Sequence, residues 1–231
     1  MGFEDEDEEE NEDEMKIRAI TFDVGGTLIE PWPSVGHVYA EVAARFGVVG
    51  VMPETLAHNF SRAWKSRASF DYATESWFAI VRETFGERAA QLPPEFYPAV
   101  FNRFADADTW HIFDDVLPTL EALAARGIKL GVISNWDERL RPLLANLNLT
   151  RHFFSIVISC EVGATKPDAR LFARAAQELG VAPGEMLHVG DSLPMDVRGA
   201  EEFGAIGRQV VRHKPLTDAR QIGSLTELCA S

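Results

Sequence analysis

The sequence predicts an α/β fold of three layers, a parallel sheet between two layers of helices, with a bundle of helices inserted into it. Two observations predict this fold. From about residue 114 onward, short apolar strands alternate with helices, which is typical of a parallel sheet covered on both faces. Between residues 31 and 113 the apolar side chains recur only at helical spacing. We therefore expect a Rossmann-like core of residues 15–30 and 114–231, and a helical-bundle insertion of residues 31–113.

The charge of the chain is concentrated near its N-terminus. Of the 231 residues, 36 are acidic and 22 are basic, which gives a formal net charge of −14. Ten acidic residues lie between Glu4 and Glu14, and without them 26 acidic residues face 22 basic ones. A run of like charges cannot bury apolar surface, so residues 1–14 are expected to form a disordered acidic tail. Because Lys and Arg are not clustered elsewhere, a nucleic-acid partner is not expected.

The sequence does not indicate a membrane protein or a disulfide-bonded one. No stretch approaches the ~20 consecutive apolar residues of a membrane span, and no signal-peptide pattern is present. Cys160 and Cys229 are isolated thiols without metal-ligand spacing, as is usual in a reducing compartment. These features predict a cytoplasmic protein and leave its oligomeric state open.

The first strand and the inserted helices follow one another from residue 17. The segment IRAITFD, residues 17–23, has the pattern of a buried strand. Four apolar groups at helical spacing predict four helices: Val35, Val38, Val42 and Phe46; Leu56, Phe60, Ala63 and Trp64; Phe78, Val81 and Phe85; and Tyr97, Val100, Phe101 and Phe104. No strand is expected among these helices, and their aromatic residues are expected to form the core of the bundle.

The rest of the sheet domain alternates between helices and strands. Helices are predicted at residues 116–126, 139–148, 168–179 and 195–203, and strands at residues 129–134, 154–159 and 186–190, with a last strand at residues 205–211. Three strands end in polar residues, namely Asp23, Ser134 with Asn135, and Asp191. Ligands of parallel sheets bind beyond the carboxyl ends of the strands, so these side chains are expected to form one site.

Four motifs in order along the chain carry this chemistry: FDVGGTL, VISN, ATKPD and HVGDSLPMD. Together they resemble the haloacid dehalogenase (HAD) superfamily, which consists mostly of phosphatases, and the inserted helices lie where that family carries a cap. The ISNWDERL, TKPD and ESWF stretches resemble more narrowly the rhythmically-expressed-gene-2-like and dehalogenase-like hydrolase domain-containing protein 3 subgroup. The resemblance implies a hydrolase that acts on a small phosphorylated molecule through an aspartyl-phosphate intermediate.

The same resemblance assigns roles to individual residues. It implies that Asp23 is the nucleophile and that Lys166 assists it. Phosphate binding is implied for Gly26, Ser134, Asn135 and Lys166, and Mg²⁺ binding for Asp23, the Gly25 carbonyl, Asp191 and Asp196. Elementary electrostatics agrees with a metal site, because three carboxylates in one cleft cannot all stay ionised without compensation, and Mg²⁺ prefers oxygen ligands.

Gly25 departs from the family pattern. Most phosphatases of this family have a second Asp at this position, which protonates the leaving group and activates water. General acid–base help contributes ~10²–10⁴-fold to the rate, so we expect a slow phosphatase. The alternative is a binding or regulatory protein with weak or no turnover.

Other interpretations of the glycine are weaker. A haloacid dehalogenase would not need the acids Asp191 and Asp196, which would repel its anionic substrate. A phosphonate hydrolase would use a cap lysine, and Lys65 is the one lysine of residues 31–113, but RAWKSRA does not resemble that motif. Asp137 could replace the missing acid, although an N-cap for the helix expected at residue 139 is favoured.

Overall fold

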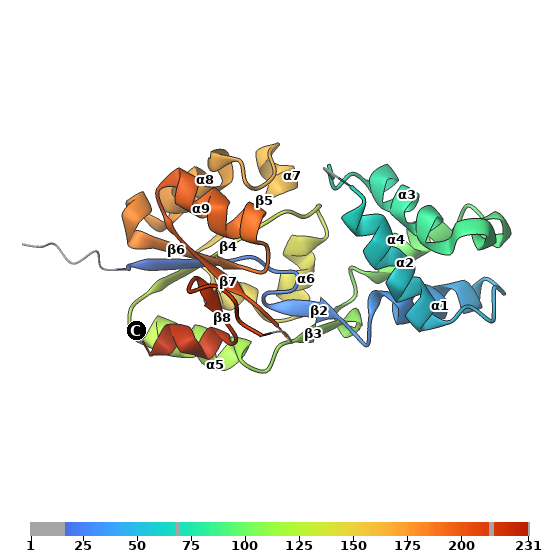
Figure 1. The fold of residues 1–231 in the computed structure, drawn as a ribbon, viewed down its shortest axis with the longest axis horizontal. Coiled ribbons are helices and arrows are strands. Elements are labelled where there is room, and N and C mark those ends of the chain that lie inside the picture. Colours follow the sequence, from blue (N-terminus) through green and yellow to red (C-terminus); the bar gives the residue numbers. More distant parts are fainter. Residues whose placement is uncertain (1–16, 68–69, 213–214, 231) are drawn as a thin grey trace, which may run out of the picture.

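The computed structural model describes residues 17–67, 70–212 and 215–230, and a sheet covered by helices lies beside a separate layer of helices (Figure 1). The predicted acidic tail, residues 1–14, lies outside the described residues. Within the described part of the chain, no helix is long and apolar enough to cross a membrane.

The main sheet has six parallel strands in the order β5-β4-β1-β6-β7-β8. Their bounds are β1 Ala19–Phe22, β4 Lys129–Ser134, β5 Ser155–Ile158, β6 Met186–Gly190, β7 Ile206–Val210 and β8 Gln221–Ile222. The predicted α/β class is confirmed. The strand predicted as the last one is followed by β8, which has only two residues and therefore no alternating pattern to detect.

The sheet register explains why the site forms at one edge. Phe22 of β1 pairs with Val132 of β4 on one side and with Val189 of β6 on the other. The three strands therefore end within two residues of one another. Because parallel strands present their carboxyl ends at the same edge, Asp23, Ser134 and Asp191 emerge together.

Helices cover both faces of this sheet (Figure 1). On one face lie α5 Val116–Ala125, α6 Leu140–Asn146 and a C-terminal 3₁₀ helix at Leu225–Cys229. On the other lie α8 Ala169–Leu179 and α9 Arg198–Phe203, while the short α7 Ser159–Val162 directly follows β5. A π-helical turn, Leu193–Val197, precedes α9, and further 3₁₀ turns span Thr150–His152 and Pro183–Glu185.

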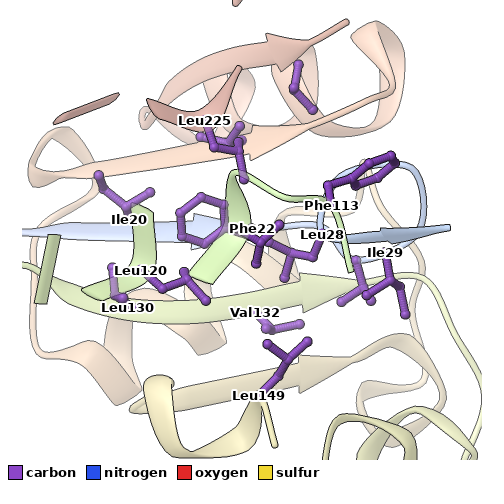
Figure 2. Close-up of a cluster of buried hydrophobic side chains, with 14 of the residues drawn as sticks. Ile20, Phe22, Leu28, Ile29, Phe113, Leu120, Leu130, Val132, Leu149 and Leu225 are labelled. Atoms are coloured by element: carbon purple, nitrogen blue, oxygen red, sulfur yellow. The ribbon is translucent and has the colours of Figure 1, made fainter. Parts of the chain in front are cut away.

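Alternate residues of the central strands supply the two apolar cores. Ile20 and Phe22 of β1 join Leu130 and Val132 of β4 beneath α5 and α6 (Figure 2), whereas Ala19 packs against α8 and α9. Phe22 has no exposed surface. Full burial of such a side chain stabilises the fold by ~1.5–3 kcal/mol, so the strand that carries Asp23 is held rigidly.

The four helices expected in the insertion are present and share a core of their own. Their bounds are α1 Val35–Arg45, α2 Pro53–Lys65, α3 Thr74–Phe85 and α4 Phe96–Arg103, with 3₁₀ turns at Gly86–Gln91 and Ala107–Thr109. This helical layer buries Tyr39, Phe85 and Phe96 among others. The first two helices pack closely because α1 carries Gly36, where a Cβ would lie 1.9 Å from the Pro53 carbonyl oxygen.

A two-stranded antiparallel ribbon joins the helical layer to the sheet domain. It pairs β2 Ile29–Pro31 with β3 Trp110–Ile112. Between α1 and α4 the described residues contain no strand, as predicted, but the ribbon at the two ends of the insertion was not predicted. A strand of three residues is too short to show an alternating pattern, and each strand of the ribbon is stabilised by its partner from a distant part of the chain.

Arg212 secures both ends of this connection to the core. Its guanidinium donates to the Thr27 carbonyl oxygen at 2.7 Å and to the Asp115 carboxylate at 2.7 Å, and it lies 4.2 Å from the centre of the Phe113 ring. The Asp115 carboxylate also accepts hydrogen bonds from Ser224 Oγ and from the backbone N–H of Leu225. The outgoing and the returning chain are thus tied to the C-terminal segment.

Candidate active site

Asp23 is held from one side by two polar side chains. It follows β1 directly, and its Oδ1 accepts hydrogen bonds from Ser134 Oγ at 2.8 Å and from Lys166 Nζ at 2.7 Å. Among the described residues, no hydrogen bond is recorded for its other carboxylate oxygen, Oδ2. One oxygen of Asp23 is therefore fixed, and the other remains available to a ligand.

Lys166 is a buried cation between two carboxylates. Its side chain is 2% exposed, and Nζ contacts Asp23 Oδ1, Asp196 Oδ1 and the Ile133 carbonyl oxygen. Burial alone would lower the pKa of its ammonium group, but the charges of Asp196 and Asp23 outweigh burial and raise this pKa above its usual value. Lys166 is therefore a permanent positive charge at the carboxyl edge of the sheet.

Asp196 is anchored by partners that include a residue the sequence analysis did not identify. Besides Lys166, its carboxylate contacts His188 Nε2 at 3.2 Å and accepts from the Ser192 backbone N–H at 2.9 Å. His188 is fully buried in β6, and its Nδ1 contacts Thr21 Oγ1 at 2.9 Å. Burial lowers the pKa of this imidazole below its usual value. A polar histidine within the apolar strand MLHVG was the signal in the sequence.

Asp191 completes a cluster of three carboxylates. Ligand oxygens of Asp23, Asp191 and Asp196 lie within 4.8 Å of one another. Asp191 lies in the cleft, where part of its surface is open to solvent but its carboxyl is poorly hydrated. This loss of hydration, followed by the charges of Asp23 and Asp196, raises the pKa of the Asp191 carboxyl to about 7. The oxygen-rich, negatively charged cluster fits a divalent cation such as Mg²⁺.

Two glycines beside the cluster have different constraints. Gly26 has a φ of +74°, and a Cβ there would lie 2.8 Å from Asp191 Oδ2, so only glycine fits. Gly25 has no positive φ. A Cβ at Gly25 would instead lie 3.2 Å from Cζ3 of Trp136. An indole ring therefore stands beside the position where a second acid would carry its side chain.

Asn135 fastens the lysine loop to the end of β4. Its Oδ1 accepts from the Lys166 backbone N–H at 2.6 Å, and its Nδ2 donates to the Lys166 carbonyl oxygen at 3.2 Å. Both polar atoms of the Asn135 amide thus contact the main chain of Lys166. This arrangement positions the loop between α7 and α8 that carries the buried ammonium group.

Asp137 links the sheet domain to the helical layer, and it lies two residues before Arg139, the N-cap residue of α6. Its carboxylate, 1% exposed, accepts from Arg139 Nε at 2.7 Å, from Arg139 Nη2 at 2.6 Å and from Trp77 Nε1 at 2.9 Å. Arg139 also donates to the Phe101 carbonyl oxygen at 2.6 Å, and its guanidinium lies 3.5 Å from the centre of that ring. The predicted N-cap position is wrong by two residues, but Asp137 Oδ1 also accepts from the Arg139 backbone N–H at 3.1 Å, so this side chain holds the start of α6 as well as the link to Trp77.

One cavity connects the carboxylates with the helical layer. Its volume is about 630 Å³, and it extends from Asp23 and Lys166 to aromatic side chains of α1–α4. Those aromatics were expected to form the core of the bundle, yet several line this cavity.

Tyr72 also lines the cavity, from a backbone with φ +60° that costs a non-glycine residue about 1–2 kcal/mol. Burial, and then the charge of Asp23, raise the pKa of its phenol above its usual value. Lys65 is exposed and is not among the described residues of the wall.

A comparison with known families shows to which family the chain belongs. The family model "haloacid dehalogenase-like hydrolase" matches residues 17–204, which include all the motifs of the site. The chain belongs to the haloacid dehalogenase-like hydrolase family.

Individual HAD hydrolases resemble it over most of their length. Haloacid dehalogenase-like hydrolase domain-containing protein 3 of Mus musculus is 33% identical, over 89% of this chain and 86% of that protein. Glyceraldehyde 3-phosphate phosphatase of Methanopyrus kandleri is 30% identical, over 86% and 85%. The crystal structure of a HAD phosphatase from Thermococcus onnurineus superposes with a TM-score of 0.65 at 25% identity, over 92% and 96%. The predicted family and subgroup are thereby confirmed.

The link through Arg139 predicts a large effect on the stability of this hydrolase. Replacement of Arg139 by Met would leave the buried Asp137 carboxylate without its cation, which we expect to lower the free energy of unfolding by ~3–5 kcal/mol. Arg141→Met is the matched control on the same helix, since its pair with Glu161 is about half exposed and is expected to contribute ~0–1 kcal/mol. Urea unfolding checks both values. Equal losses in the two variants would contradict the inferred importance of the buried pair.

Proposed function

We propose that this HAD hydrolase is a Mg²⁺-dependent phosphatase that works through an aspartyl-phosphate on Asp23. One observation carries the proposal. The Asp23 carboxylate is oriented through Oδ1 by Lys166 and Ser134, while Oδ2 stays available beside two further carboxylates. A carboxylate fixed at one oxygen is preorganised to attack with the other.

The charges of the site call for a divalent cation. Asp23, Asp191 and Asp196 carry three negative charges when ionised, and Lys166 carries one positive charge. A phosphate ester would be repelled by this excess. We propose that Asp23, Asp191, Asp196 and the Gly25 carbonyl hold Mg²⁺, which would neutralise charge on the transferring phosphoryl group.

The protein residues divide the remaining work. Lys166 supplies positive charge below the phosphoryl group, while its N–H donors keep their contacts with Asp23, Asp196 and the Ile133 carbonyl oxygen. Ser134 would turn its single O–H from Asp23 to a phosphoryl oxygen when the ester binds. The Gly26 N–H already donates to the Ile29 carbonyl oxygen, so Gly26 shapes the turn and is not proposed as a phosphate donor.

Asp23 attacks phosphorus, the bond from phosphorus to the leaving oxygen breaks, and the leaving group departs with the electron pair. Water then attacks the phosphorus of phospho-Asp23, gives up a proton to solvent and releases phosphate and the free carboxylate. Asn135 keeps the Lys166 loop in place during both steps.

The glycine at residue 25 predicts a slow reaction. Gly25 carries no carboxyl to protonate the leaving group, and the indole of Trp136 lies beside it. Asp137 does not substitute for it, because its carboxylate oxygens already accept from Arg139 and Trp77. Loss of general acid–base help costs ~10²–10⁴-fold, least for leaving groups that are stable as anions.

We further propose that residues 31–113 act as a cap over the site and residues 15–30 and 114–231 as the catalytic core. The shared cavity supports this division, because its phosphate end is built by the core and its opposite end by α1–α4. The partner proposed for this cavity is a small phosphorylated molecule, enclosed between a rigid sheet edge and the helical layer.

Hydrolysis of an activated ester tests the proposed function. With Mg²⁺ present, the wild type should release phenolate from 4-nitrophenyl phosphate, and Asp23→Asn should lower the rate at least ~10³-fold because the nucleophile is lost. Rapid-quench measurements should show a burst of phenolate, since no base speeds the hydrolysis of phospho-Asp23. Equal rates for wild type and Asp23→Asn would contradict the mechanism, and no turnover on any ester would favour a binding protein.

Thermal unfolding tests the metal site without any substrate. Mg²⁺ at about 100 times its Kd would stabilise the native state by ~2.7 kcal/mol, which corresponds to a rise in Tm of roughly 5–10 °C for a chain of this size. Asp191→Asn should remove most of this rise. A wild-type Tm that does not respond to millimolar Mg²⁺ would refute the proposed metal site.

Restoration of the missing acid requires a change at Trp136 as well. Gly25→Asp alone should gain little, because its Cβ lies 3.2 Å from the indole. Gly25→Asp combined with Trp136→Ala should accelerate the hydrolysis of alkyl phosphates by up to ~10²-fold, since only alkoxides need the proton.

The control for this gain is Gly25→Ala combined with Trp136→Ala, which opens the same space without a carboxyl group. Circular dichroism establishes that each variant is folded. An equal gain in both double variants would show that space, and not the acid, limits the reaction.

A further inference from the structure

The cavity is larger than its phosphate-binding end requires. Its floor, formed by Asp23, Ser134, Lys166, Asp191 and Asp196, occupies one end of a space of about 630 Å³. That volume lies within the range of pockets that enclose a whole small molecule, roughly 300–1,000 Å³. The remaining space therefore has to be matched by the part of the substrate that is not phosphate.

The walls of the remaining space are mainly aromatic. We call this part the aromatic chamber and define it by Phe60, Trp64, Trp77, Phe101, Trp110 and Trp136. Trp64 and Trp77 are stacked at 5.8 Å with an angle of 10° between their planes, and Phe60 stacks on Trp64 at 6.3 Å and 15°. Such neighbouring rings give the wall a large apolar aromatic surface, against which an aromatic ligand can stack or pack edge-to-face.

The chamber has few polar groups, and Arg139, Trp77 and Trp110 already use theirs within the protein. Among the described residues of its wall, Arg139 alone carries a charge, and its guanidinium is bound to Asp137 and to the Phe101 carbonyl oxygen. The indole N–H of Trp77 donates to Asp137, and that of Trp110 donates to the Phe104 carbonyl oxygen. The indole N–H groups of Trp64 and Trp136 are the polar groups of the chamber for which the described residues show no partner. A sugar or glycerol group, with several hydroxyls, would find too few partners on a wall of this kind, and buried unpaired hydroxyls oppose binding.

The chemistry at Gly25 points to the same substrate independently. Because residue 25 is a glycine with the Trp136 indole packed beside it, no acid at this position protonates the leaving oxygen, which favours departure as an anion. A phenolate departs readily in this way, since its charge spreads over the ring, whereas a sugar or alkyl alkoxide does not. The shape of the chamber and the missing acid therefore select the same chemical group.

We propose that the substrates of this protein are phosphate esters of aromatic alcohols, above all phenols, whose ring system lies in the aromatic chamber while the phosphate lies on the floor. This proposal rests on the proposed phosphatase function and adds the substrate class. Glycerol and sugar phosphates are disfavoured as substrates by the apolar wall, and esters of linear aliphatic alcohols by their basic leaving group.

Esters with leaving groups of similar acidity but different size provide the test. Phenyl phosphate and 2-naphthyl phosphate release phenols of closely similar acidity, so a difference between them reports on the chamber. With Mg²⁺ present, the naphthyl ester should have a KM at least tenfold below that of the phenyl ester. Glycerol phosphate and hexyl phosphate should each have a kcat/KM at least 100-fold below that of the naphthyl ester.

Variants locate the preference in the chamber. Trp64→Ala should lose most of the tenfold difference between the two aryl esters, and Trp64→Leu serves if the alanine variant does not fold. Phe154→Ala is the control, because this ring is 74% exposed and lies outside the cavity, and it should keep the difference. Loss of the difference in Phe154→Ala as well would contradict the assignment to the chamber.

Binding of a non-hydrolysable compound separates failure of this inference from failure of the proposed function. In calorimetry, naphthylmethylphosphonate should bind with a Kd at least tenfold below that of methylphosphonate, and Trp64→Ala should lose the difference. Tight binding without turnover of any ester would refute the phosphatase and leave the aromatic ligand class standing. Turnover with equal KM for the two aryl esters, or equal Kd for the two phosphonates, would overturn the aromatic class.

Discussion

The buried ammonium group of Lys166 is the interaction on which the site depends. An unpaired ammonium ion in a protein interior costs several kcal/mol, and here Asp23, Asp196 and the Ile133 carbonyl oxygen offset that cost. The same contacts fix one oxygen of Asp23 and hold Asp196 beside His188. Ends of separate strands are thereby drawn together around one positive charge.

The charge balance around Lys166 also connects stability with chemistry. One cation cannot compensate three carboxylates, and this excess of negative charge adds to burial in raising the pKa of Asp191 to about 7. A divalent cation would relieve it, and a phosphate could then approach a site whose nucleophile is already oriented. The arrangement that crowds negative charge at the sheet edge is thus what gives the proposed metal ion its place.

The helical layer is fastened to the core at two separate positions. Arg212 binds the two chain segments that lead to and from the β2–β3 ribbon. Across the cavity, Asp137 binds Trp77 and Arg139 binds Phe101. These contacts set the distance between the carboxylate cluster and the aromatic wall. Trp136, next to Asp137 in sequence, lies against Gly25. One short segment therefore both packs beside this glycine and joins the two parts of the protein.

The sequence by itself determined the alternation of strands and helices, the four inserted helices and the positions of Asp23, Ser134, Lys166, Asp191 and Asp196. Each depends on local periodicity or on motifs that lie in order along the chain, and both can be seen in one dimension. Short elements escaped this reasoning, because β2, β3 and β8 are stabilised by distant partners and have no pattern of their own.

Only the tertiary structure decided what the aromatic residues and the segment after Asn135 do. Helical spacing gives the same signal for a ring that packs in a core and for one that lines a cavity, so the chamber could not be predicted. The contacts of Asp137 and Trp136 join residues far apart in the chain, with Trp77 60 residues from Asp137. Such contacts arise when the helical layer folds back over the sheet edge, and that packing is specified by the whole chain rather than by any one motif.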